Sequence, residues 1–152
     1  MSFLFKKLLL LHFLLRQCTE KFHWLPFLLT RLAIGLVFVE SGWGKFHKLP
    51  SIIAYFGSLG IPAPELQAPF VAAVELICGL LILGGALTSV ASLPLIGTMI
   101  VAIITAKKDD ITSTSDLFFL SEYTFILLLL WLTFYGAGAF SIDNLIKRKM
   151  KK

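Results

Sequence analysis

Charged side chains are scarce in this chain, and their scarcity excludes most soluble folds. Only 15% of the 152 residues are Asp, Glu, Lys or Arg, whereas 57% are hydrophobic and the mean hydropathy is +0.86. A soluble domain carries about 25% charged residues, so this chain has too little polar surface to cover a core in water. The composition therefore indicates a protein whose apolar surface faces lipid.

Cysteine and histidine are also few, which excludes the common metal, haem and disulfide motifs. The two cysteines, Cys18 and Cys78, form no CxxC pattern, and the three histidines, His12, His23 and His47, include no pair at i, i+4. We therefore expect no metal site, and no cofactor motif is evident. The net charge of +5 comes from basic residues gathered at the chain ends. Without a basic stripe carrying interleaved aromatics, we expect no nucleic-acid partner and instead membrane lipids.

Residues 1–25 form a separate N-terminal segment. Its apolar stretch, 3–15, is interrupted by Lys6 and Lys7 and is shorter than the roughly 20 residues of a membrane span. No small-residue cleavage site follows it, so it does not match a cleaved signal peptide. We predict an amphipathic helix over 3–23 that lies at the cytoplasmic interface. An uncleaved, partly inserted helix is the alternative.

Four apolar segments within residues 26–145 predict transmembrane helices at about 27–46, 68–87, 90–106 and 117–140. The link after the first span is rich in proline and glycine, and its apolar stretch at 52–59 predicts a short helix on the outer face. A basic tail, 146–152, closes the chain. The predicted fold class is all-α: an integral membrane four-helix transmembrane bundle with an N-terminal interfacial helix.

The distribution of lysine and arginine predicts the orientation. With four spans, both termini lie on one side, and the two terminal segments together carry nine Lys and Arg residues. The opposite loops carry four, namely Lys45, Lys48, Lys107 and Lys108. Because basic residues are retained in the cytoplasm, we expect both termini to be cytoplasmic.

Apart from Lys45, which closes the first span, four charged residues fall inside the predicted spans: Arg31, Glu40, Glu75 and Glu122. A charge at mid-membrane costs about 2.5–3.5 kcal/mol on insertion scales, so each needs a partner or a wet cavity. At 100° per residue, Glu40 lies opposite Arg31 on the first span, so these two cannot pair. We expect Arg31 to pair with Glu75 in a narrow polar pocket, with Glu122 at a span entrance. Such a pair either holds the bundle in register or lines a cavity for a quinone, lipid or small solute.

Small residues predict where helices pack. Gly35 and Gly42 share the face of the first span that bears the arginine, and Gly79 lies on a small-residue face of the second span. These faces allow close backbone approach and make self-association into a homo-oligomer plausible. At the outer end of the first span, Lys45 and His47 are boundary candidates that we expect to extend toward lipid headgroups.

Taken in order, these motifs resemble the DoxX family. Residues 31–46 have the arginine, the glycine-rich middle and the terminal Gly42-x-x-Lys45 of its first helix, and 74–84 have its Glu-x-x-x-Gly-x-x-x-x-Gly pattern. Residues 99–107 are similar to its third helix, and Glu122-Tyr123 followed by 136–143 to its fourth helix and tail. The resemblance covers about 27–145.

The resemblance implies a multi-pass protein of the bacterial inner membrane with Arg31, Glu75 and Glu122 as its polar positions, whereas Glu40 departs from the family pattern. Some relatives resemble membrane subunits of quinone-linked oxidoreductases. The resemblance thus implies the membrane subunit of a quinone- or thiol/sulfur-linked redox complex. Such a chain is an accessory oxidoreductase subunit, with quinone as the candidate ligand and redox proteins as candidate partners. The alternative is a non-enzymatic membrane carrier or scaffold for a small solute, lipid or partner protein.

Overall fold

The computed structural model describes residues 7, 12–13, 16 and 20–150, and over these residues the chain forms helices and no strand. Most of the N-terminal helix predicted at 3–23 lies outside the described residues. The helices are α2 (Trp24–His47), α3 (Leu49–Ser58), α4 (Pro64–Gly84), α5 (Thr88–Thr105), a 3-10 turn (Lys108–Asp110), α6 (Thr114–Phe119), α7 (Ser121–Tyr135) and α8 (Ile142–Met150). The predicted all-α class is confirmed.

Three helices in the described part of the chain, α2, α4 and α5, are long and apolar enough to cross a membrane. Their outer faces expose large apolar side chains, among them Leu36, Ile77 and Ile104, each about half accessible or more. Apolar surface on this scale is stable only when lipid replaces water as the solvent. The molecule is therefore a helical membrane bundle.

The fourth predicted span needs new boundaries, because the apolar stretch at 117–140 is not one helix. A capping box at Ser113 and Asp116 begins the short helix α6, and Leu120 is extended between α6 and α7. Helix α7 has 15 residues, about 22 Å, and ends where Gly136 takes a φ of +74°. Helix α7 is thus shorter than the roughly 30 Å hydrocarbon core.

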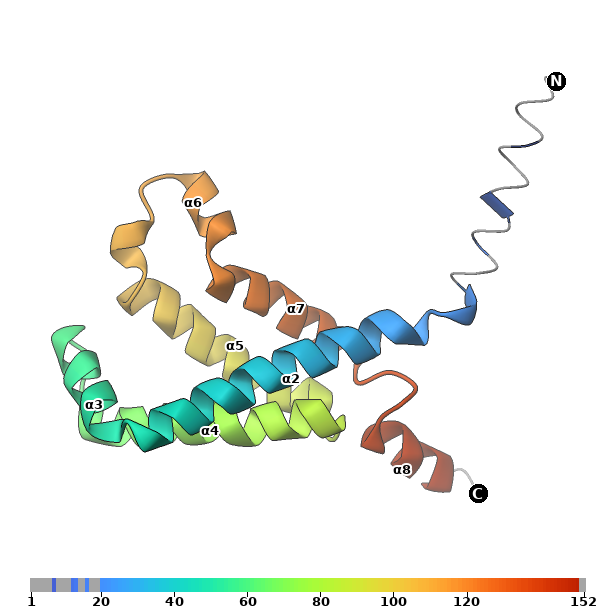
Figure 1. Cartoon of the computed structure of the whole chain (residues 1–152), viewed down its shortest axis with the longest axis horizontal. Helices are drawn as coiled ribbons and strands as arrows, with labels where there is room; N and C mark the ends of the chain where they lie inside the picture. The colour runs from blue at the N-terminus through green and yellow to red at the C-terminus, as the bar shows by residue number, and fades with distance from the viewer. Residues whose placement is uncertain (1–6, 8–11, 14–15, 17–19, 151–152) are drawn as a thin grey trace.

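The four helices α2, α4, α5 and α7 form the bundle, with α2 lying along α4 and α5 along α7 (Figure 1). Glycines bring α2 and α4 together backbone to backbone. A Cβ atom at Gly42 would lie 2.5 Å from the Leu76 amide nitrogen, and one at Gly79 would lie 2.8 Å from the Val39 nitrogen. A Cβ atom at Gly35 would lie 2.9 Å from the Leu83 backbone of α4. Only glycine permits this approach.

The core lies where the four helices meet. Its fully buried aliphatic and aromatic side chains are Ile34, Phe38, Ile82, Leu95, Leu129 and Leu132, and the polar side chains of Glu75, Thr88 and Ser92 are fully buried as well. Polar groups lie toward the two ends of this core. Helix α3 stands at one end, and α8 lies beside the other, where α2 begins and α4 ends (Figure 1).

Candidate functional site

A cavity of about 570 Å³ lies among α2, α3, α4 and α5 and reaches α7. Most of its wall is aliphatic or aromatic. The polar side chains on the wall are Ser41, Lys45, Tyr55, Gln67, Glu75, Thr98, Thr105 and Glu122. Small-molecule sites are typically apolar clefts of about 300–1,000 Å³ with a few convergent polar groups. The cavity matches that description.

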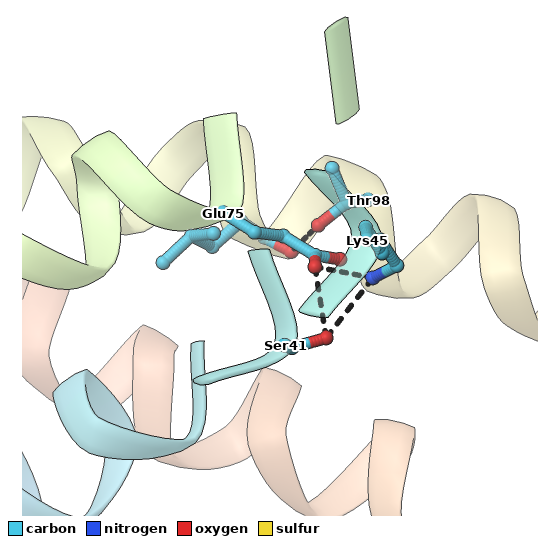
Figure 2. Close-up of polar contacts among 5 residues, drawn as sticks. Ser41, Lys45, Glu75 and Thr98 are labelled. Carbon is cyan, nitrogen blue, oxygen red and sulfur yellow. Dashed lines mark hydrogen bonds and ion pairs between the residues drawn. The ribbon is translucent and has the colours of Figure 1, made fainter. Parts of the chain in front are cut away.

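Three side chains form a closed polar triangle on this wall: Ser41 and Lys45 from α2, and Glu75 from α4 (Figure 2). The Ser41 hydroxyl donates to Glu75 Oε2 at 2.9 Å, and Lys45 Nζ donates both to Ser41 Oγ at 3.0 Å and to Glu75 Oε2. Ser41 and Lys45 are four residues apart, so one helix face presents both. The close contact at Gly42 then brings the Glu75 carboxylate within their reach.

The two charges of this pair differ in burial. The Glu75 side chain is 2% exposed, whereas that of Lys45 is 23% exposed. A buried carboxylate needs a cation and further hydrogen bonds to offset its desolvation. Ser41 and Lys45 also border a shallow outer groove that Glu40 and Lys48 line. The triangle therefore stands between this groove and the cavity, and Glu40 belongs to the groove.

Two further polar residues approach the cavity from other helices. Thr98 of α5 lies beside the triangle (Figure 2), and its hydroxyl donates to the Leu95 carbonyl at 2.8 Å. Glu122, in the first turn of α7, lines the same cavity and accepts a hydrogen bond from the Ser121 hydroxyl at 3.1 Å. Carboxylates from α4 and α7 thus face one space.

The predicted pairing of Arg31 with Glu75 is wrong. Arg31 lies about 21 Å from Lys45 along α2, at the opposite end of the bundle from the triangle. It is buried, and its Nη1 donates to the Ala137 carbonyl at 2.9 Å. Lys45, expected at the headgroups, is instead the cation of Glu75. Both cations lie on the glycine-bearing side of α2, and the axial position of α4 decides which one meets the carboxylate.

Near Arg31, hydrogen bonds of Asp143 connect the C-terminal segment to the start of α5. The Asp143 carboxylate accepts hydrogen bonds from the backbone amides of Leu87 at 2.8 Å and Thr88 at 3.2 Å. The Asp143 amide donates to the Gly85 carbonyl at 3.0 Å, and its carboxylate acts electrostatically on the guanidinium. Arg31 thus lies in a structural joint, outside the cavity.

The remaining predicted residues lie away from the cavity. His47 is exposed at the end of α2, where its Nδ1 contacts the Trp43 carbonyl at 2.9 Å. Cys78 is buried in the core. Among the residues that the structure describes, no group of three His, Cys, Asp or Glu side chains could hold a metal ion. Sequence reasoning missed Ser41 and Thr98, although the i, i+4 spacing of Ser41 and Lys45 was a usable signal.

The fold and site define a helical membrane protein with a ligand-sized cavity beside a buried ion pair. Comparison with known proteins gives the family: the DoxX family model matches residues 27–108, a segment that contains Ser41, Lys45, Glu75 and Thr98. The chain belongs to the DoxX family.

Three relatives each align with most of this chain. The Bacillus subtilis protein named "Putative oxidoreductase CatD" is 30% identical over 125 residues, which is 82% of this chain and 89% of the relative. The Mycobacterium tuberculosis protein named "Uncharacterized membrane protein Rv3486" is 32% identical, covering 78% of this chain and 80% of the relative. The Escherichia coli protein named "Inner membrane protein YqjF" is 29% identical, covering 80% and 92%. No solved structure matches.

Proposed function

We propose that this DoxX protein is the membrane subunit of a redox complex and binds a quinone in the cavity beside Lys45 and Glu75. The observation that carries the proposal is the position of this ion pair on the wall of a largely apolar cavity of about 570 Å³. A quinone combines an apolar ring and tail with carbonyl oxygens. It therefore suits a site that is apolar except for a few convergent donors and acceptors.

The polar triangle can serve such a ligand in two ways. The Lys45 ammonium, already partly exposed, has three donors and can give a hydrogen bond to a quinone carbonyl. Reduction of a quinone to a quinol consumes two electrons and two protons, and Glu75 with Lys45 can pass protons from the outer groove. The electrons come from a partner protein, which is why we propose a subunit. The name of the Bacillus relative agrees with a redox role.

We place the protein in the bacterial inner membrane with both termini in the cytoplasm. The name of the Escherichia coli relative supports this membrane. The excess of Lys and Arg in the two terminal segments supports the orientation. Reporter fusions at each terminus test it, because alkaline phosphatase is active only outside the cytoplasm. Phosphatase activity from either fusion would contradict the orientation.

The ligand is tested by purifying the full chain in native nanodiscs and identifying co-purified quinones by mass spectrometry. Loss of a hydrogen bond to a charged group costs about 1.5–3 kcal/mol, so we expect roughly tenfold weaker retention or more in Lys45→Met. Glu75→Gln should lower quinone-dependent electron transfer in membranes at equal protein level. Glu65→Gln is the matched control, because this exposed carboxylate in the first turn of α4 lines neither the groove nor the cavity.

Two results would contradict the proposal. One is a quinone-to-lipid ratio equal to that of the surrounding membrane and unchanged in Lys45→Met. The other is a bound solute or lipid with no electron transfer in any variant, which would favour the carrier or scaffold alternative. Either result leaves the polar triangle as a structural ion pair.

A further inference from the structure

Helix α8 carries an apolar face that the rest of the described chain leaves uncovered. Leu145, Ile146 and Met150 are 61%, 51% and 79% exposed. At 100° per residue they fall, with Ile142, on one side of the helix. In Figure 1, α8 follows a loop and lies outside the four-helix bundle. Its apolar side chains therefore need a partner that is not part of the bundle.

The other side of α8 is basic. Lys147 and Arg148 point away from the apolar face, whereas Lys149 falls between Leu145 and Ile142 around the helix, so its long stem lies along the apolar face and its ammonium extends beyond it. All three are in the last turn of the helix, where cations are favourable. An amphipathic helix with cations opposite an apolar face is typical of segments that lie in a membrane interface.

Aromatic side chains locate the membrane surface at this end of the bundle. The rings of Trp24 and Phe140 are 4.8 Å apart, and those of Trp131 and Tyr135 are 4.3 Å apart. Tryptophan and tyrosine gather at the level of lipid headgroups. Helix α8 begins two residues after Phe140, so it starts at that level.

The start of α8 is held at the bundle. Asp143, in its first turn, accepts the hydrogen bonds from the two amides at the beginning of α5. A Cβ atom at Gly84 would lie 3.5 Å from Ile142 Cδ1, which puts the beginning of α8 against the end of α4. The helix therefore cannot leave the interface without breaking these contacts.

We propose that α8 lies in the plane of the membrane and binds anionic lipid. Its apolar side chains enter the boundary between headgroups and acyl chains, while Lys147 and Arg148 contact lipid phosphates. Two observations favour lipid over a partner protein as the binding partner of α8: the helix is basic, and it begins at the level of the aromatic side chains that mark the lipid headgroups. This inference is independent of the proposed quinone site.

The test uses the full-length chain with Cys18→Ser and Cys78→Ala, and a nitroxide on Ile146→Cys, in nanodiscs of phosphatidylcholine with phosphatidylglycerol. Collisions with oxygen, which dissolves in lipid, are compared with collisions with a water-soluble nickel chelate. We expect oxygen to dominate at position 146. A nitroxide on Asp109→Cys, in an exposed 3-10 turn, should favour the nickel chelate.

The role of charge is tested by Lys147→Gln with Arg148→Gln and Lys149→Gln. Each cation near an anionic surface raises the equilibrium constant for membrane binding about fivefold. Loss of all three cations should therefore shift the equilibrium of α8 between membrane and water toward water on the order of a hundredfold. Lys107→Gln with Lys108→Gln removes cations from outside α8 and should change nothing at position 146. Equal access of the nickel chelate to positions 146 and 109, or no response to the triple change, would overturn the proposal. If position 146 were shielded from both oxygen and the nickel chelate, the apolar face of α8 would be covered by protein, and this result would also overturn the proposal.

Discussion

Replacing Lys45 by methionine should destabilise the bundle more than replacing Glu75 by glutamine. Methionine keeps most of the apolar stem of lysine but removes the ammonium. It leaves the Glu75 carboxylate, at 2% exposure, with the Ser41 hydroxyl and no cation. Removing one partner of a buried ion pair costs about 3–5 kcal/mol, because the other charge stays buried without compensation.

Glu75→Gln should cost less, about 1–3 kcal/mol. Without the Glu75 carboxylate, the Lys45 ammonium has lost its ion-pair partner. The Lys45 side chain is 23% exposed and borders the outer groove, so its flexible stem allows the ammonium to turn toward water. Glutamine also keeps an acceptor for the Ser41 hydroxyl. The double variant buries no charge and should resemble Glu75→Gln alone. The coupling energy between Lys45 and Glu75 is therefore expected to equal the cost of Lys45→Met, about 3–5 kcal/mol.

The assay is reversible unfolding in mixed detergent micelles, followed by tryptophan fluorescence, for the two single variants and the double variant. A second cycle with Arg31→Gln and Glu75→Gln is the matched control. These two residues lie at opposite ends of the bundle, so their effects should add within about 0.5 kcal/mol. Additive effects of Lys45 and Glu75, or a stronger coupling of Arg31 to Glu75, would refute the arrangement of charges described above.

Three other outcomes are expected. Gly42→Ala should destabilise the bundle by about 1–3 kcal/mol in the same assay, since the added Cβ would meet α4 backbone. Asp143→Ala should cost about 0.5–2 kcal/mol, as for a lost helix cap, and should speed hydrogen exchange at the two amides that begin α5. In the loop before α6, hydrogen bonds from the Thr112 hydroxyl and nearby amides hold the pKa of Asp116 below its usual range. The stabilisation that these hydrogen bonds give the loop should be complete above the ordinary Asp pKa of about 3.9. It should disappear as the pH falls through the lowered pKa of Asp116. The NMR chemical shift of the Asp116 carboxyl carbon, followed against pH, measures this pKa.

Each of these expectations has its own control. Gly44→Ala, where an added Cβ meets nothing within 4 Å, should be neutral or stabilise by up to about 1 kcal/mol; equal losses at Gly42 and Gly44 would contradict the packing argument. Unchanged exchange at the start of α5 in Asp143→Ala would exclude its capping role. Thr112→Val should return the Asp116 pKa toward its ordinary value, and an unchanged titration would show that these hydrogen bonds do not set it.

The amino-acid sequence alone determined the class of molecule and the faces of its helices. Scarce charge and long apolar runs allow only a membrane bundle, because no soluble surface can be built from them. The 100° step of the helix places Gly35 and Gly42 on one side of α2 and Glu40 on another, as the structure has them. Helical periodicity supplies these angles without any tertiary information.

Only the tertiary structure decided which charged side chains form an ion pair and where the apolar stretch 117–140 is divided into two helices. Periodicity gives angles around a helix axis but not the offset between two helices along their axes. That offset is set by backbone contacts such as the one between Gly42 and Leu76. It places the Glu75 carboxylate beside Lys45, whereas Arg31 hydrogen-bonds to the Ala137 carbonyl near the C-terminal end of the chain. The extended Leu120 divides α6 from α7, a break that the continuous apolar composition of 117–140 does not signal.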